Sequence, residues 1–249
     1  MRRLTVLLAA LVPIAIVIGS PPDIASELKA IREEYTKAQQ DFFKEIQAAK
    51  GEEAQTKIYN EKNPAPKFKA KLRDLAKRAN GDPAEFDVLV FAYDLERQTA
   101  QEGGKECADL ANDIVARFGT NPKIAQFAQM IDWPIPPTES RALLAKLLDL
   151  NRGKASEPTL LYRLASNYKG WGQPAPEDEK RATDLLQELV AKHPNAAETK
   201  RAKGDLFELQ NLVVGKTFPE FDAKDENDGA WKLSDYRGKV VVLDFWGFW

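Results

Sequence analysis

The chain has 249 residues, of which 43% are hydrophobic and 30% are charged; this composition excludes an intrinsically disordered protein and allows one or two folded domains. Its 36 basic and 38 acidic residues nearly cancel, so the charge gives no reason to expect a nucleic acid as partner. One cysteine excludes an internal disulfide, and one histidine without a cluster of ligands argues against a metal site. No cofactor is expected.

The first 20 residues are typical of a secretory signal. Arg2 and Arg3 precede the apolar run Leu4 to Ile18, and the small residues Gly19 and Ser20 follow it. The run is shorter than the roughly 20 residues that a membrane-spanning helix needs, which favours a cleaved signal over an uncleaved anchor. The sequence therefore predicts an exported protein of the periplasm or cell envelope, which meets the membrane only through this segment if it is retained.

Two helices are predicted between residues 21 and 80. Apolar residues recur along each of them at steps of three and four, as they do on the packed face of a helix. These residues are Ile24, Leu28, Ile31, Tyr35, Ala38 and Phe42, followed by Phe68, Leu72, Leu75 and Ala79. Gly51 and the proline-containing stretch 63–66 separate the two helices.

Residues 81–212 are predicted to form a domain of short helices joined by turns rich in proline and glycine. Asp82 is expected to cap the first of these helices, with Pro83 as its first residue, and Thr138 is expected to cap a later one. The segments 115–122 and 190–195 resemble each other, and both end a helix. We therefore expect stacked helical hairpins similar to degenerate tetratricopeptide repeats, with an irregular helical domain as the alternative.

Two residues of this helical domain carry reactive side chains. Cys107 falls on an apolar stripe with Leu110, Ala111 and Ile114, so we interpret it as a core cysteine and not as a redox centre. His193 stands at the end of a helix, where a cation interacts favourably with the helix dipole. A capping role is expected for it, since the chain has no second histidine.

The segment 213–249 contains several short motifs in a fixed order. These are Val214-Gly215-Lys216, Phe218-Pro219-Glu220-Phe221, Asp228-Gly229, the stretch from Leu233 to Lys239, and Val240 to Trp249. In this order they resemble the start of a thioredoxin-like domain of the redoxin type, the group that includes TlpA-like oxidoreductases and the alkyl-hydroperoxide-reductase and thiol-specific-antioxidant proteins. A hairpin turning at residues 226–229, a turn at 234–237 and a buried central strand over 239–246 are expected.

The resemblance also implies an activity and site residues. In the family this strand leads through a tryptophan, here Trp249, into a Cys-x-x-Cys motif that exchanges thiols with disulfides of partner proteins. Asp244 is similar to a buried aspartate that relays a proton to the second cysteine, and Phe245, Trp246 and Trp249 would form the wall of the active site. The expected cysteines lie beyond Trp249, so the polypeptide as given is expected to be an inactive N-terminal part of such an enzyme.

The overall expectation is a mainly α-helical protein followed by an incomplete α/β thioredoxin-like fold. Two alternatives for the function are a thiol peroxidase of the same superfamily and a non-enzymatic scaffold whose helices bind another exported protein. The end at Trp249 has two explanations, a fragment of a longer gene or a UGA codon that encodes selenocysteine at the first cysteine position.

Overall fold

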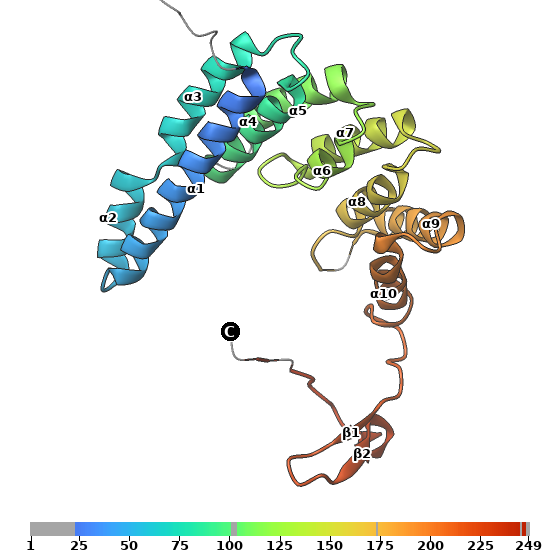
Figure 1. The fold of residues 1–249 in the computed structure, drawn as a ribbon. Helices are drawn as coiled ribbons and strands as arrows, with labels where there is room; N and C mark the ends of the chain where they lie inside the picture. The colour runs from blue at the N-terminus through green and yellow to red at the C-terminus, as the bar shows by residue number, and fades with distance from the viewer. Residues whose placement is uncertain (1–22, 101–103, 173, 245, 248–249) are drawn as a thin grey trace, which may run out of the picture. The chain divides into compact units, whose positions relative to one another are not determined.

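The computed structural model describes residues 23–100, 104–172, 174–244 and 246–247, and its described part is mainly helical (Figure 1). The chain divides into two compact units, residues 1–88 and 89–249, and the division falls inside the helix α4. The described helices are α1 (Ile24–Ala48), α2 (Glu52–Lys62), α3 (Ala65–Arg78), α4 (Glu85–Thr99), α5 (Lys105–Phe118), α6 (Ile124–Ala128), α7 (Pro137–Leu150), α8 (Glu157–Lys169), α9 (Pro176–Lys192) and α10 (Ala197–Asn211). The predicted fold class, mainly α with a small β part at the C-terminal end, is confirmed.

In the first unit, α1 packs against both α2 and α3. The carboxylate of Asp23 caps α1 by accepting a hydrogen bond of 2.8 Å from the backbone N–H of Ser26. Tyr35 of α1 and Phe68 of α3 meet edge to face, with ring centroids 5.1 Å apart, and both side chains are buried. The helix α2 was not predicted, because it buries none of its residues and so leaves no apolar period in the sequence.

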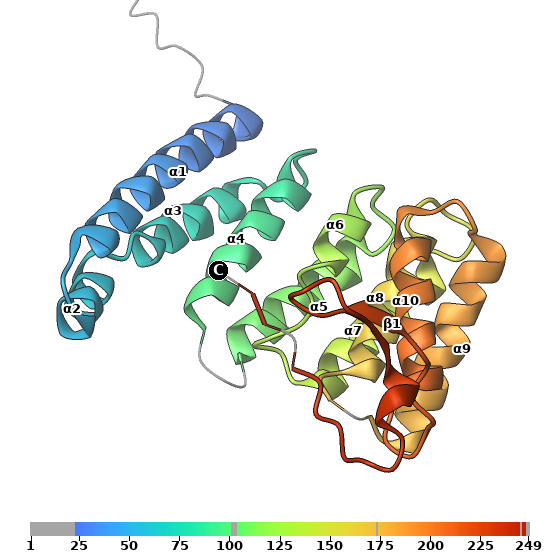
Figure 2. The same cartoon turned by 90° about the horizontal axis from the view of Figure 1, so that it is seen from below.

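In the second unit, consecutive helices pack as pairs: α7 with α8, α8 with α9, and α9 with α10. Figure 2 shows α8, α9 and α10 side by side. The leucines that recur at steps of three and four along α7 and α8 are buried: Leu143, Leu144, Leu147, Leu148, Leu160, Leu161 and Leu164. The helical hairpins expected from the sequence are therefore present. No helix in the described ranges is both long enough and apolar enough to cross a membrane.

Four of the turns between helices share one backbone hydrogen-bonding pattern. In each, a carbonyl accepts from the N–H three residues later, and the carbonyl of that residue accepts from the N–H three further on. The four sets of residues are Ala79, Asp82 and Glu85; Phe118, Asn121 and Ile124; Asn151, Lys154 and Glu157; and His193, Ala196 and Thr199. The last residue of each set lies in the first turn of a helix and is buried. The chain thus uses the same turn at intervals of 33 to 42 residues, while the comparison with tetratricopeptide repeats stays a prediction.

Two predicted helix starts are wrong by one or two residues. Helix α4 begins at Glu85 and not at Pro83, because the residues from Gly81 to Ala84 form a turn in which the Asp82 carboxylate accepts from the N–H of Ala84 at 2.7 Å. Helix α7 begins at Pro137, so Thr138 lies inside the helix and does not cap it. Proline lacks a backbone N–H and suits a first helical position, which explains the earlier start of α7.

A two-stranded antiparallel sheet lies in the C-terminal segment. Strands β1 (Asp222–Lys224) and β2 (Ala230–Lys232) pair with Ala223 opposite Trp231. The short helix η1 (Leu233–Tyr236) follows directly. The predicted hairpin turn at 226–229 and the predicted turn at 234–237 are confirmed in place.

Candidate functional site

The hairpin of the C-terminal segment is held by a small aromatic cluster. Phe221 contacts both Phe218 and Trp231, with centroid distances of 6.3 and 5.5 Å, and Trp231 contacts Tyr236 at 5.5 Å. All of these pairs are edge to face, the arrangement that the ring quadrupoles favour. The cluster joins the residues just before β1 to β2 and η1, and so holds η1 against the hairpin.

The turn of the hairpin depends on Asp225 and Gly229. The Asp225 carboxylate accepts hydrogen bonds from the backbone N–H groups of Asn227 at 2.9 Å and Gly229 at 2.8 Å. A Cβ atom on residue 229 would lie 2.7 Å from an Asp225 carboxylate oxygen, so a larger residue would displace the carboxylate from these hydrogen bonds. The glycine of the Asp228-Gly229 motif therefore helps to keep the Asp225 carboxylate hydrogen-bonded to the turn.

Two further bonds place η1 against the hairpin. The carboxylate of Asp235 accepts from the N–H of Lys232 at 2.9 Å, and that of Glu220 accepts from the N–H of Ser234 at 3.0 Å. The second bond holds the pKa of Glu220 below its ordinary value, because the N–H and hydroxyl of Ser234 stabilise the ionised form. Glu220 belongs to the Phe-Pro-Glu-Phe motif, which gives that motif a structural role.

The segment after η1 is extended but is not part of a sheet, so the predicted central strand over 239–246 is wrong for the described residues. Val240 and Val242 are 96% and 86% exposed, whereas Val241 and Leu243 are 40% and 37% exposed. This alternation follows the period of two of an extended chain. A strand needs a neighbour to receive its hydrogen bonds, and no described strand lies beside this segment.

The predicted site residues of this segment have different outcomes. Asp244 is exposed, so the burial on which its expected proton relay depends is not present. Trp246 is 74% exposed and forms no closed wall. Phe245 and Trp249 lie outside the described residues.

The two reactive residues of the helical part lie where the sequence predicted them. Cys107 is fully buried. His193 follows the last residue of α9, and its backbone N–H donates to the carbonyl of Leu189 at 2.9 Å. Its Nε2 lies 3.3 Å from the carboxylate of Glu157, a contact that the sequence did not indicate. Among the described residues, no group of three His, Cys, Asp or Glu side chains is arranged to hold a metal ion.

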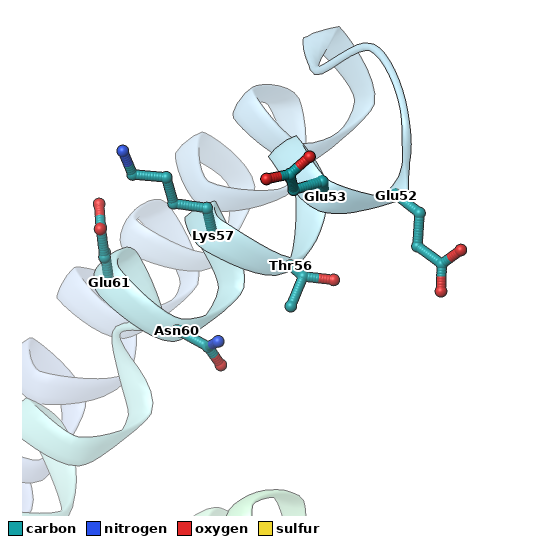
Figure 3. Close-up of a pocket in the computed structure, with 6 residues that line it drawn as sticks. All are labelled: Glu52, Glu53, Thr56, Lys57, Asn60 and Glu61. Atoms are coloured by element: carbon teal, nitrogen blue, oxygen red, sulfur yellow. The ribbon is translucent and has the colours of Figure 1, made fainter.

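Two hollows are present on the described surface. The first follows α2 and is lined by Glu52, Glu53, Thr56, Lys57, Asn60 and Glu61, all from this one exposed helix (Figure 3). It offers no enclosed environment for chemistry. The second has a volume of about 720 Å³ and lies among α7, α8, α10 and two loops. Sequence reasoning missed this cleft.

Comparison with known proteins gives a short match. No protein-family profile matches the chain. It is 50% identical over 38 residues to the thiol-disulfide oxidoreductase ResA of Geobacillus kaustophilus and 47% identical over 38 residues to ResA of Geobacillus thermodenitrificans. Each match covers 15% of this chain and 22% of the relative. The matched length is close to that of the segment 213–249, and the similarity supports a thioredoxin-like relationship to thiol-disulfide oxidoreductases.

Proposed function

We propose that the segment 213–249 is the first part of a thioredoxin-like domain of the redoxin type, and that the protein containing it is an exported thiol-disulfide oxidoreductase. The observation that carries this proposal is an ordered series: an aromatic hairpin, the helix η1, and then an apolar extended segment from Val240 to Leu243. The 38-residue similarity to two oxidoreductases supports the same assignment.

The proposed reaction is thiol-disulfide exchange with partner proteins. A thiolate of the enzyme attacks one sulfur of a substrate disulfide, forms a mixed disulfide and releases the other substrate sulfur as a thiolate. A second enzyme thiol then attacks the mixed disulfide, which leaves an enzyme disulfide and a reduced substrate. The chain has one cysteine, and Cys107 is buried in the helical part, so these 249 residues do not complete the cycle on their own.

Asp244 is proposed to act only when further strands cover it. Burial would raise the pKa of its carboxyl group and allow it to exchange a proton with the second thiol. In this proposal Phe245, Trp246 and Trp249 supply the apolar wall that lowers the dielectric around that group.

A chimera tests the proposal directly. The 38-residue stretch of the Geobacillus kaustophilus relative is replaced by the matching stretch of this chain, and the reduction of insulin disulfides is measured. The chimera is expected to fold and to keep activity within about tenfold of the parent, because the packing requirements of the sheet are the same. A matched chimera with Val241→Asp is expected to lose the fold, since an unpaired carboxylate in a central strand is costly. An unfolded first chimera would contradict the assignment.

Two simpler measurements complete the test. The polypeptide 21–249 is expected to reduce insulin no faster than its Cys107→Ser variant, and turnover above that control would contradict the proposed mechanism.

For export, the proposal places a cleaved signal at residues 1–20, so mass spectrometry of the protein secreted by a bacterial host is expected to show an N-terminus near Pro21. An intact Met1 in the cytosol would oppose it.

A further inference from the structure

The cleft of about 720 Å³ in the second unit is built from elements that the repeated turns bring together. Its walls include Tyr162, Arg163 and Lys169 of α8, and Asp205 and Glu208 of α10. The start of α7 and the loops 132–135 and 170–172 also line it. Volumes of this size are typical of sites that hold a whole ligand, so the cleft has room for more than one side chain.

Two tryptophans line this cleft and are exposed. Trp133 is 59% exposed and Trp171 is fully exposed. Trp171 stands between Gly170 and Gly172, whose φ angles of +60° and +86° suit glycine and turn the chain so that the indole projects. Tryptophan is the residue most enriched where binding energy is concentrated, and two exposed indoles in one cleft indicate a docking surface.

The two cations of the cleft, Arg163 and Lys169, already form hydrogen bonds and ion pairs with other residues of the protein. The guanidinium of Arg163 donates to the carbonyls of Ala128 and Ile131 and to the carboxylate of Asp132, at 3.3 to 3.4 Å. The ammonium of Lys169 lies 2.9 Å from Asp205 and 2.7 Å from Glu208. Both side chains are at most about a quarter exposed. An anionic ligand would therefore have to displace existing partners.

Two of the three carboxylates of the cleft are more exposed than its cations, whereas Asp205 is 19% exposed, like Lys169. The side chains of Asp132 and Glu208 are 46% and 48% exposed. Oδ1 of Asp132 is buried and has no hydrogen-bond partner among the described residues. Its other oxygen, Oδ2, accepts from Arg163 at 3.3 Å. Three carboxylates, Asp132, Asp205 and Glu208, line the cleft with two cations, Arg163 and Lys169, so the cleft carries a net charge of −1.

We propose that this cleft docks an extended, basic segment of a partner protein. An arginine or lysine of that segment would lay its aliphatic part on the indole of Trp133 or Trp171 and its charge over the ring face. The same charge would lie near Asp132 or Glu208. Since these two carboxylates come from different elements, a chain with several basic residues fits the cleft better than a single small cation. This proposal goes beyond the oxidoreductase function and does not depend on it.

The test uses the full chain and a fluorescein-labelled octapeptide of alternating glycine and arginine, with binding followed by anisotropy at low salt. Trp171→Ala and Glu208→Gln are each expected to weaken binding by about three- to tenfold, the size of one cation–π or charge contact. The indole of Trp171 is fully exposed, so its removal does not threaten the fold. Asp184→Asn is the control: Asp184 pairs with Lys180 on the surface of α9 at 52% side-chain exposure and lies outside the cleft.

The control is expected to bind within twofold of the parent, and an octapeptide of alternating glycine and glutamate is expected not to bind. Equal weakening in Asp184→Asn, or equal binding of the glutamate peptide, would overturn the proposal by showing that only net charge or nonspecific contact is measured. Competition by free arginine at the same concentration of guanidinium groups would also overturn it, in favour of a small-cation site.

Discussion

The carboxylate of Glu157 accepts a hydrogen bond of 2.9 Å from the backbone N–H of Gly153, four residues earlier. The carboxylate of Glu85 makes the same bond to Gly81 at 2.8 Å. Both glutamates begin a helix, both are buried at 4% exposure, and both glycines have a positive φ. Two of the four repeated turns are therefore closed by one device, a buried glutamate that satisfies the N–H of a left-handed glycine.

Replacing Glu157 by glutamine is expected to destabilise the second unit by about 2 kcal/mol, the size of a charge-assisted hydrogen bond. Burial raises the pKa of Glu157, but the N–H of Gly153 and the cations of Arg152 and His193 outweigh it, so the pKa is lowered from 4.5. Since the folded-state pKa is the lower one, this stability is present above about pH 4.5 and is lost as the pH falls through the folded-state value.

Urea unfolding between pH 3 and 7 checks this. The parent is expected to lose stability on acidification more steeply than the Glu157→Gln variant. Parallel pH profiles for the two proteins would contradict the assigned role of the carboxylate.

The glycines of this chain are expected to respond in opposite directions to alanine. Gly153 has a φ of +74°, so alanine there is expected to cost about 1 kcal/mol for the left-handed conformation. Gly204 lies inside α10, and a Cβ there would meet nothing within 4 Å. Gly204→Ala is therefore the matched control and is expected to stabilise by about 0.5–1 kcal/mol. Thermal melting of both variants measures the difference, and a shift of the same sign in both would refute it.

Cys107 is expected to resist modification in the native protein. Its side chain is fully buried in α5, so reaction with a thiol reagent requires opening of the helical core. We expect labelling to be on the order of a thousandfold slower than in urea. A Gln187→Cys variant in a Cys107→Ser background provides an exposed thiol on α9 as the reference for fast labelling. Similar rates for the two thiols would show that Cys107 is accessible and would reopen a redox role.

The apolar segment after η1 is expected to cause self-association. Val240 and Val242 are almost fully exposed, and an extended chain with unpaired backbone groups pairs readily with a second copy. The double variant Val240→Lys, Val242→Lys is expected to remain monomeric at concentrations where the parent scatters light. Two lysines on the exposed α9 surface, Gln187→Lys and Ala191→Lys, add the same charge and give a matched control that should aggregate like the parent.

Periodicity predicted most of the helical core, because residues such as Leu144, Leu160 and Phe68 owe their burial to neighbours within the same unit. It missed α2 and α6. The first buries no residue, and the second is five residues long, too short to display a helical period. The start of α7 was misjudged because Thr138 is a good capping residue by type, whereas the preceding prolines set the actual boundary.

The C-terminal segment shows a different limit. The run from Val240 to Leu243 has the composition of a buried strand, and composition reports the environment for which a sequence is suited. Its actual exposure depends on neighbours that no described strand provides. The cleft was missed for the opposite reason: Trp133 and Trp171 are 38 positions apart, and only the folded turns bring them to one surface.

The pairwise packing of helices joined by the repeated turns also determines how the second unit unfolds under force. Because α7, α8, α9 and α10 each pack chiefly on the next helix in the chain, a pulling force on the C-terminal end of α10 is resisted mainly by its packing on α9 and α8. Under mechanical load the second unit is expected to unfold one helical hairpin at a time, so its force–extension curve should show several small force peaks. A protein of this build could then be threaded through a narrow pore without its whole core having to unfold at once.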